Sequence, residues 1–118
     1  MTTPRPPDRD RFTTLAEFWP FYLSEHARAG TRALHFIGTT GALLWIVVAA
    51  VRRDPRLLAV AVVNGYALAW CGHFFIEKNR PATFRYPVKS LVCDWLMYGC
   101  ILTGQIDKQL RKHGVSHT

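Results

Sequence analysis

The stretch ALHFIGTTGALLWIVVAAVRRDPRLLAVAVVNGYALAWCGHFFIE, residues 33–77, contains two long apolar runs separated by a short charged segment. Each run, Ala33–Val51 and Leu57–Ile76, has about 20 residues and would be roughly 30 Å long as a helix, enough to cross the hydrocarbon core of a bilayer. In the segment between them, Asp54 is a good N-cap residue and Pro55 suits the first turn of a helix. The stretch therefore predicts two long helices joined as a hairpin.

The remaining chain predicts two further helices. Thr14 and Glu17 have the spacing of a capping box, which opens a short helix that ends at Gly30. A third apolar run, Val88–Ile106, is interrupted by polar residues and can either span a membrane or lie against the other two. We expect long helices over residues 32–51, 55–77 and 87–112.

These elements predict an all-α fold, a small multi-helix integral membrane bundle of three long helices plus a short N-terminal helix. We expect one helical domain over residues 13–112, between a disordered tail at 1–12 and a C-terminal tail at 113–118. At 118 residues the chain has the length of a single domain.

Composition agrees with a membrane location. The chain is 49% hydrophobic, yet its formal net charge is +7. Its cations flank the apolar runs instead of lining one polar face, which favours membrane surfaces over nucleic acid as the partner. Both ends of the hairpin are basic, so the charge distribution does not orient it. We expect a multi-pass integral membrane protein, in the inner membrane if the source is bacterial, and self-association is left open.

Ionisable side chains converge at one end of the predicted bundle. His35 lies 19 residues before Asp54 and His73 lies 19 residues after it, so a hairpin about Asp54 brings both imidazoles to one level. Asp94 and His26 come from helices that begin or end there. Such a group suits a transition metal. A ferritin-like di-iron site would need about four carboxylates in paired motifs, which the predicted helices lack.

Each of these residues alone also has a structural interpretation. His35 is compatible with a hydrogen-bonded core histidine, and His73 with Glu77 with an i, i+4 pair. Asp94 is compatible with simple pairing to Lys89 or Arg85. The convergence favours function, because ionisable groups at membrane depth are costly and are commonly functional.

Two motifs resemble a known family. FYLSEHARAGTRALHFIGT (residues 21–39) and GHFFIEKNRPATFRYP (residues 72–87) are similar in order and spacing to the Mpo1-like family, over roughly residues 15–107. The specific elements are Tyr22 with His26, Leu34–His35, and Gly72–His73 leading into Glu77. Thr31 departs from the pattern, which has Asn before the arginine.

The resemblance implies a membrane-bound Fe²⁺-dependent dioxygenase that catalyses α-oxidation of 2-hydroxy fatty acids, with O₂ as co-substrate, and gives a fatty acid one carbon shorter. It implies one Fe²⁺ per chain, held by His26, His35 and His73, with Glu77 as a fourth ligand or as a partner that orients an imidazole. We expect the substrate carboxylate to meet Arg32, Lys78 or Arg80, and its acyl chain to pass Tyr66 and Trp70.

Two alternatives remain open. One is a zinc-dependent lipid hydrolase with Glu77 as general base, which would act without O₂. The other is a non-catalytic membrane protein in which the polar cluster only locks the helices together.

Overall fold

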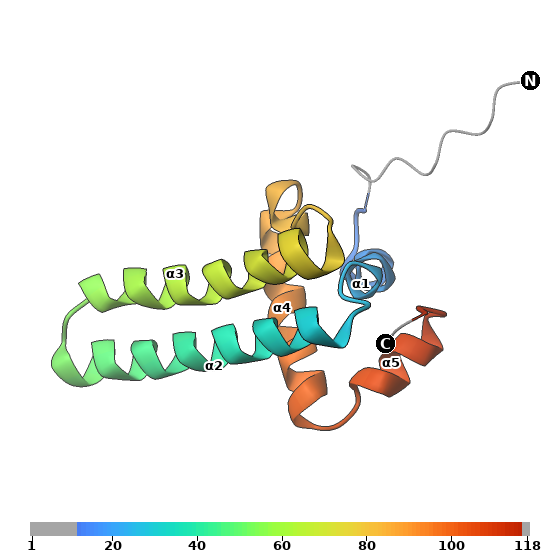
Figure 1. The fold of residues 1–118 in the computed structure, drawn as a ribbon. Coiled ribbons are helices and arrows are strands. Elements are labelled where there is room, and N and C mark those ends of the chain that lie inside the picture. The colour runs from blue at the N-terminus through green and yellow to red at the C-terminus, as the bar shows by residue number, and fades with distance from the viewer. Residues whose placement is uncertain (1–11, 117–118) are drawn as a thin grey trace, which may run out of the picture.

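The computed structural model describes residues 12–116, and within that range every regular element is a helix. The elements follow one another from a short N-terminal helix, through a long hairpin, to two C-terminal helices (Figure 1). In chain order they are α1 (Leu15–Ser24), α2 (Ala29–Arg52), α3 (Arg56–Cys71), the π-helix η2 (Gly72–Glu77), the 3₁₀-helix η3 (Ala82–Phe84), α4 (Pro87–Leu102) and α5 (Ile106–Lys112). The all-α prediction is confirmed, whereas the predicted N-terminal tail lies largely outside the described residues.

The predicted hairpin is confirmed as α2 and α3, which run antiparallel and side by side (Figure 1). Small residues let the two backbones approach closely. A Cβ added to Gly38 would lie 3.1 Å from the carbonyl oxygen of Gly65. Across the same contact, the Asn64 side chain donates a hydrogen bond of 3.0 Å to the carbonyl oxygen of Gly38. Close packing of this kind fixes the register of the two helices.

The turn of the hairpin uses the residues that the sequence indicated. Arg53 ends α2 in the left-handed region at φ 52°. The Asp54 carboxylate then accepts the backbone N–H of Arg56 at 3.1 Å and its guanidinium at 2.9 Å. Asp54 therefore satisfies an amide at the start of α3, as an N-cap does.

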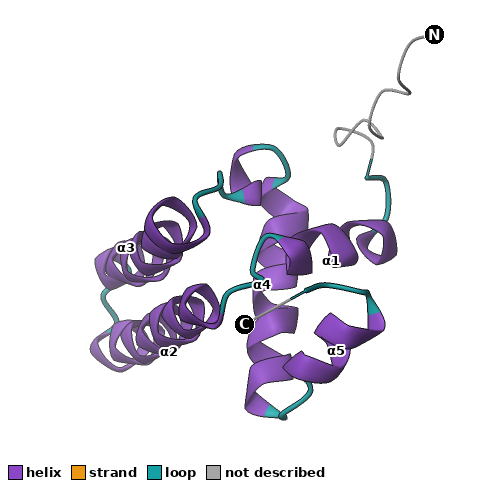
Figure 2. Cartoon of the chain, turned by 45° about the vertical axis from the view of Figure 1, so that its right-hand side comes forward, coloured by secondary structure: helices purple, strands orange, loops and turns teal. Residues whose placement is uncertain are grey.

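The predicted bundle of three long helices is wrong in one respect. The helix expected over residues 87–112 is two helices, because Gly104 adopts φ +72° and the Thr103 hydroxyl bonds back to Gly99 at 2.8 Å. In both ribbon views α4 runs across the base of the hairpin instead of alongside it (Figures 1 and 2). With 16 residues, or roughly 24 Å, α4 is also much shorter than α2.

A compact core lies at the base of the hairpin, where α1 and α4 meet. Thr14 caps α1 by accepting the Glu17 amide at 3.1 Å, so the predicted capping box is present. The buried side chains come from α1, η3, α4 and the N-cap of α4, and half of them are aromatic: Phe18, Tyr22, Ala82, Tyr86, Cys93 and Met97. This core fixes α1 and α4 against each other and supports the polar site above it.

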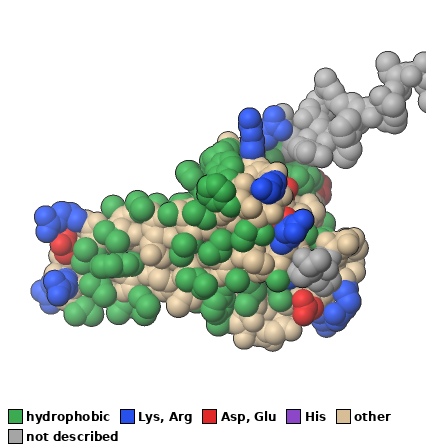
Figure 3. Space-filling model, in the orientation of Figure 1, with side chains coloured by type: hydrophobic (Ala, Val, Ile, Leu, Met, Phe, Trp, Pro, Cys, Tyr) green, Lys and Arg blue, Asp and Glu red, His purple; other side chains and the backbone are tan. Residues whose placement is uncertain are grey.

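The outer surface of the hairpin is apolar. The most apolar 18-residue windows of Ala29–Arg52 and Arg56–Glu77 have mean hydropathies of 1.9 and 1.5, and only 17% and 22% of those windows are buried. Val51 is 77% exposed and Val63 is 65% exposed. Hydrophobic side chains cover the arm up to a charged tip (Figure 3). Two helices are therefore long and apolar enough to cross a membrane.

Candidate metal centre

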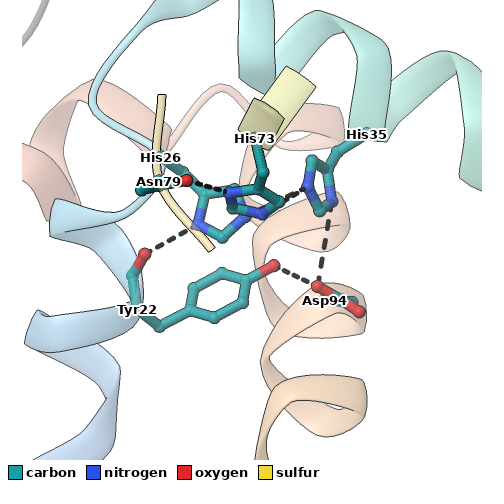
Figure 4. Close-up of polar contacts among 6 residues, drawn as sticks. All are labelled: Tyr22, His26, His35, His73, Asn79 and Asp94. Atoms are coloured by element: carbon teal, nitrogen blue, oxygen red, sulfur yellow. Dashed lines mark hydrogen bonds and ion pairs between the residues drawn. The ribbon is translucent and has the colours of Figure 1, made fainter. Parts of the chain in front are cut away.

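Three buried histidines from separate parts of the chain meet at the base of the hairpin (Figure 4). His26 follows α1, His35 lies in the second turn of α2, and His73 lies in η2. The Nε2 atom of His35 is 3.1 Å from that of His26 and 3.3 Å from that of His73. The three side chains are between 1% and 6% exposed. The prediction that His35 and His73 meet, because they are equally far from Asp54 along the hairpin, is therefore confirmed.

Two of the three imidazoles are held from outside by hydrogen bonds at Nδ1, and the third has a carboxylate near its Nδ1. That of His26 is 2.7 Å from the carbonyl oxygen of Tyr22, and that of His73 is 2.7 Å from Oδ1 of Asn79. The Nδ1 atom of His35 is 3.8 Å from a carboxylate oxygen of Asp94. Metal-binding histidines have this arrangement, in which an outer acceptor orients the ring and fixes its tautomer.

These acceptors determine where the protons lie. A carbonyl oxygen only accepts, so His26 carries its proton on Nδ1. The Asn79 amide nitrogen donates to the Glu25 carboxylate at 2.9 Å, which turns its oxygen toward His73 and places a proton on Nδ1 there too. In neutral rings the Nε2 atoms of His26 and His73 are then bare, and both present a lone pair toward Nε2 of His35. A proton on Nε2 of His35 can satisfy only one of these two atoms, whereas a cation among the rings accepts a lone pair from all three once His35 carries its proton on Nδ1.

The pKa values of His26 and Asp94 favour the protonation states that bind a cation. Burial, followed by the nearby charges that His35 and His73 would carry, lowers the pKa of His26 well below its usual value. Its imidazole is therefore neutral at pH 7, the form that binds a metal. Burial raises the pKa of Asp94 to about 6, and the hydrogen bond from Tyr22 opposes that rise. Asp94 is therefore mainly a carboxylate at pH 7.

Local backbone features place His73 in the cluster. Gly72 packs against the start of α2, where an added Cβ would lie 3.0 Å from Cγ2 of Thr31. The helix then widens into η2, and Lys78 ends it in the left-handed region at φ 63°. This reversal lets Asn79 return to both the carbonyl oxygen and the Nδ1 atom of His73. Short π-helical segments occur frequently at functional sites.

Asp94 faces the histidines from α4. The Tyr22 hydroxyl donates a short hydrogen bond to the same carboxylate oxygen that lies nearest His35. The alternative in which Asp94 simply pairs with Lys89 or Arg85 is therefore not the arrangement seen. Tyr22 belongs to the motif quoted above, but nothing in the sequence assigns its hydroxyl to Asp94.

Glu77 lies outside the cluster, although it was expected as a fourth ligand or as a partner that orients an imidazole. Its carboxylate accepts the backbone N–H of Arg28, the N-cap residue of α2, which has no side-chain cap. Among residues 12–116 the group that is able to hold a metal comprises the three histidines alone. Glu77 thus secures the start of α2 and is not placed to bind the metal.

The residues expected to bind substrate divide into two sets. Tyr66 and Trp70 line a small cavity of about 10 Å³ beside the three histidines. Of the cations, Arg32 is buried and donates at 2.8 Å to the carbonyl oxygens of His26 and Ala27, whereas Lys78 and Arg80 are exposed. None of the three lines that cavity.

Two polar residues that the sequence analysis did not single out belong to this region. Asn79 orients His73, and its place between Lys78 and Arg80 in the second motif was the only available signal. Ser90 lines the small cavity, is 1% exposed, and its hydroxyl oxygen has no hydrogen-bond partner. An unsatisfied buried hydroxyl is costly, so we expect a water molecule or a ligand oxygen beside Ser90, where the cavity has room for about one such atom.

Comparison with known proteins agrees with this site. Neither a search of curated proteins nor a search of solved structures finds a match to the chain. The family model described as 2-hydroxy-palmitic acid dioxygenase Mpo1-like matches residues 12–106, which include all three histidines, Asn79 and Asp94. The predicted resemblance is therefore confirmed, and the chain belongs to the Mpo1-like family.

Proposed function

We propose that the protein is an Fe²⁺-dependent dioxygenase that shortens 2-hydroxy fatty acids by one carbon. The observation that carries this proposal is the convergence of three buried imidazoles, two of them on rings whose Nδ1 is hydrogen-bonded to an outer acceptor. The name of the family supplies the substrate class and the type of reaction.

The residues present fit a ferrous ion. Imidazole nitrogen suits iron, and three protein ligands leave coordination positions for other molecules. His26, His35 and His73 would hold one ion, with Asp94 and Tyr22 keeping His35 in place. When bound, ferrous iron supplies the redox chemistry through which O₂ oxidises the substrate.

The overall reaction balances without a further reductant. One 2-hydroxy acid and one O₂ give the acid one carbon shorter, one carbon dioxide and one water. The hydroxyl-bearing C2 becomes the new carboxyl carbon, the C1–C2 bond breaks, and C1 leaves as carbon dioxide. The electrons released are those needed to reduce one O₂ fully.

The head of the substrate would meet neutral donors. Within the described chain, no lysine or arginine lines the small cavity, so the predicted roles of Arg32, Lys78 and Arg80 are not retained. The unpartnered Ser90 hydroxyl lies there and is free to donate to a carboxylate or hydroxyl oxygen. Tyr66 and Trp70 cover the same space and exclude bulk water from it.

The protein would be an integral membrane protein with the α2–α3 hairpin in the bilayer. α4 supports this placement, since an exposed apolar stripe follows one side of the helix. The stripe contains Val88, Leu91, Val92, Trp95 and Leu102. A helix that crosses the base of an inserted hairpin lies along the membrane surface, so the histidines would be at the depth of lipid head groups.

The hydrolase alternative is disfavoured by the position of Glu77. That mechanism needs the Glu77 carboxylate as a base beside the metal, yet it accepts the Arg28 N–H outside the cluster. A purely architectural role leaves one of the two bare Nε2 atoms, that of His26 or that of His73, without a proton donor, because His35 can donate to only one of them.

The test uses the full chain, purified anaerobically in detergent and reconstituted with Fe²⁺. We expect one iron per chain and O₂ uptake that depends on 2-hydroxypalmitate. His35→Ala and His73→Ala should lose both, whereas His113→Ala, which changes a histidine outside the cluster, should keep both. Zinc without O₂ uptake after iron reconstitution would favour the hydrolase. Absence of any bound metal would reduce the cluster to architecture.

A further inference from the structure

A second cavity begins at the metal centre and runs toward the tip of the hairpin. It has a volume of about 150 Å³ and lies between α2, α3 and α4. His35 and Asp94 line one end, and beyond them the walls are almost entirely apolar. The lining residues are His35, Thr39, Ala42, Ile46, Ala61, Val62, Gly65, Tyr66, Ala69, Leu91, Asp94 and Trp95. We call this cavity the slot.

The slot is long and narrow. From His35 to Ile46 it follows α2 for 11 residues, or roughly 16 Å at 1.5 Å per residue. An apolar cavity of comparable volume, about 150 Å³, in another protein holds a single benzene molecule. On the same measure the slot holds a short run of methylene groups in single file, about as many carbon atoms as benzene has, and the rest of a longer chain would lie along its open side.

Small residues on α3 create this space. Ala61, Gly65 and Ala69 recur every four residues, so they lie on one face of the helix and form the floor of the slot. Gly65 is not required there for helix packing, because an added Cβ would make only ordinary contacts, 3.7 Å from Cβ of Ala42. A larger side chain at Ala61 or Ala69 would project into the slot and fill it.

The side wall of the slot is open to the apolar surface of the hairpin. Its rim consists of side chains that are themselves partly exposed, with Ile46 at 39%, Trp95 at 43% and Val62 at 56%. An occupant therefore reaches the slot sideways, from an apolar medium, with its polar end toward His35.

We propose that the slot binds the acyl chain of the substrate next to its 2-hydroxy carboxylate head, admits it from the lipid leaflet, and selects unbranched chains. This inference rests on the proposed function for the identity of the head group. In a bilayer or micelle the acyl chain is already surrounded by hydrocarbon. A longer chain therefore gains little additional binding free energy when it enters the protein. Selection among acyl chains then depends on the width of the slot, which is set by Ala61, Ala69 and Trp95.

The first test narrows the slot. Ala61→Leu fills its far end, and Ala59→Leu adds the same bulk to the exposed side of α3 as a matched control. We expect Ala61→Leu to lower kcat/KM for 2-hydroxypalmitate about tenfold relative to 2-hydroxyhexanoate, given the cost of overpacking a close-fitting site. Iron content should be unchanged, and Ala59→Leu should leave the ratio as in the wild type.

The second test widens the slot at Trp95, whose side chain is 43% exposed. Trp95→Ala should raise turnover of a 2-hydroxy acid with a methyl branch at C4 relative to the unbranched acid. An unchanged branched-to-unbranched ratio in Trp95→Ala, together with an unchanged chain-length ratio in Ala61→Leu, would overturn the slot while leaving the dioxygenase function intact.

A binding measurement separates the slot from the reaction. In metal-free protein, a 2-hydroxy acid brominated along its chain should quench tryptophan fluorescence, and Trp95→Phe should remove most of that quenching. If the brominated acid quenches the fluorescence of Trp95 but the iron-loaded wild type shows no turnover, the slot binds the acid and the proposed reaction is wrong. If the brominated acid does not quench Trp95 and the wild type shows no turnover, both the slot and the proposed reaction are wrong.

Discussion

Replacing Asn79 with alanine tests whether the outer acceptors of the histidines control metal binding. The Asn79 side chain accepts from Nδ1 of His73 at 2.7 Å and donates to the carboxylate of Glu25 at 2.9 Å. His73 is only 2% exposed, so water does not readily replace the lost acceptor. Asn79→Ala leaves the His73 ring free to turn and leaves its N–H unsatisfied.

Two magnitudes follow from that geometry. Loss of a partner that orients a metal-binding histidine typically weakens metal affinity about 10–100-fold. An unsatisfied buried donor costs about 1–3 kcal/mol, which should appear as a lower free energy of unfolding of the metal-free protein. Both effects arise although Asn79 is not itself a ligand.

The assay is competition for Co²⁺ or Fe²⁺ against a chromophoric chelator, in detergent and without oxygen. Arg80→Ala is the matched control, because Arg80 is the next residue, is exposed and does not line the cavity. We expect the control to bind metal as the wild type does. If Asn79→Ala also binds with wild-type affinity and retains its helix content, the outer acceptors do not organise this site.

Further predictions concern the roles of individual groups. Glu77→Ala should keep full metal content but lose about 1 kcal/mol of stability in thermal or denaturant unfolding, because it removes the cap at Arg28; loss of metal instead would restore Glu77 as a ligand. Ser90→Ala should bind iron normally and raise KM for the 2-hydroxy acid about tenfold, since one hydrogen bond to a charged group is lost; an unchanged KM would place the head group elsewhere. Chelation of the iron should lower the midpoint of thermal unfolding of the wild type, and it should leave His26→Ala unaffected, since that variant lacks one of the three ligands.

The position of the metal centre along the hairpin could be predicted from the sequence. Both arms of the hairpin rise by the same amount per residue, so equal distances from Asp54 bring His35 and His73 together. The helix spacing also placed Glu77 on the side of His73, but spacing does not reveal competing partners. The uncapped N–H of Arg28 takes that carboxylate, and the reversal at Lys78 brings Asn79 back in its place.

The third long helix was mispredicted for a different physical reason. The apolar run that begins at Val88 fits a spanning helix and a surface helix equally well, because hydrophobic patterning carries no information on crossing angle. The break at Gly104 had a local signal, a glycine flanked by Thr103 and Gln105, since positive φ favours glycine. The course of α4 across the hairpin depends on tertiary contacts with α1 that no local pattern contains.

Because α4 crosses the hairpin, this one helix supplies residues both to the metal centre and to the slot. Leu91, Asp94 and Trp95 have the spacing of a single helix face, and all three line the slot. A parallel α4, as in the predicted bundle, would have laid that face along the hairpin and closed the slot over much of its length. Because α4 crosses at the base, Asp94 reaches His35 while the slot stays open toward the tip. The boundary between the polar head site and the apolar slot therefore lies where α4 meets α2.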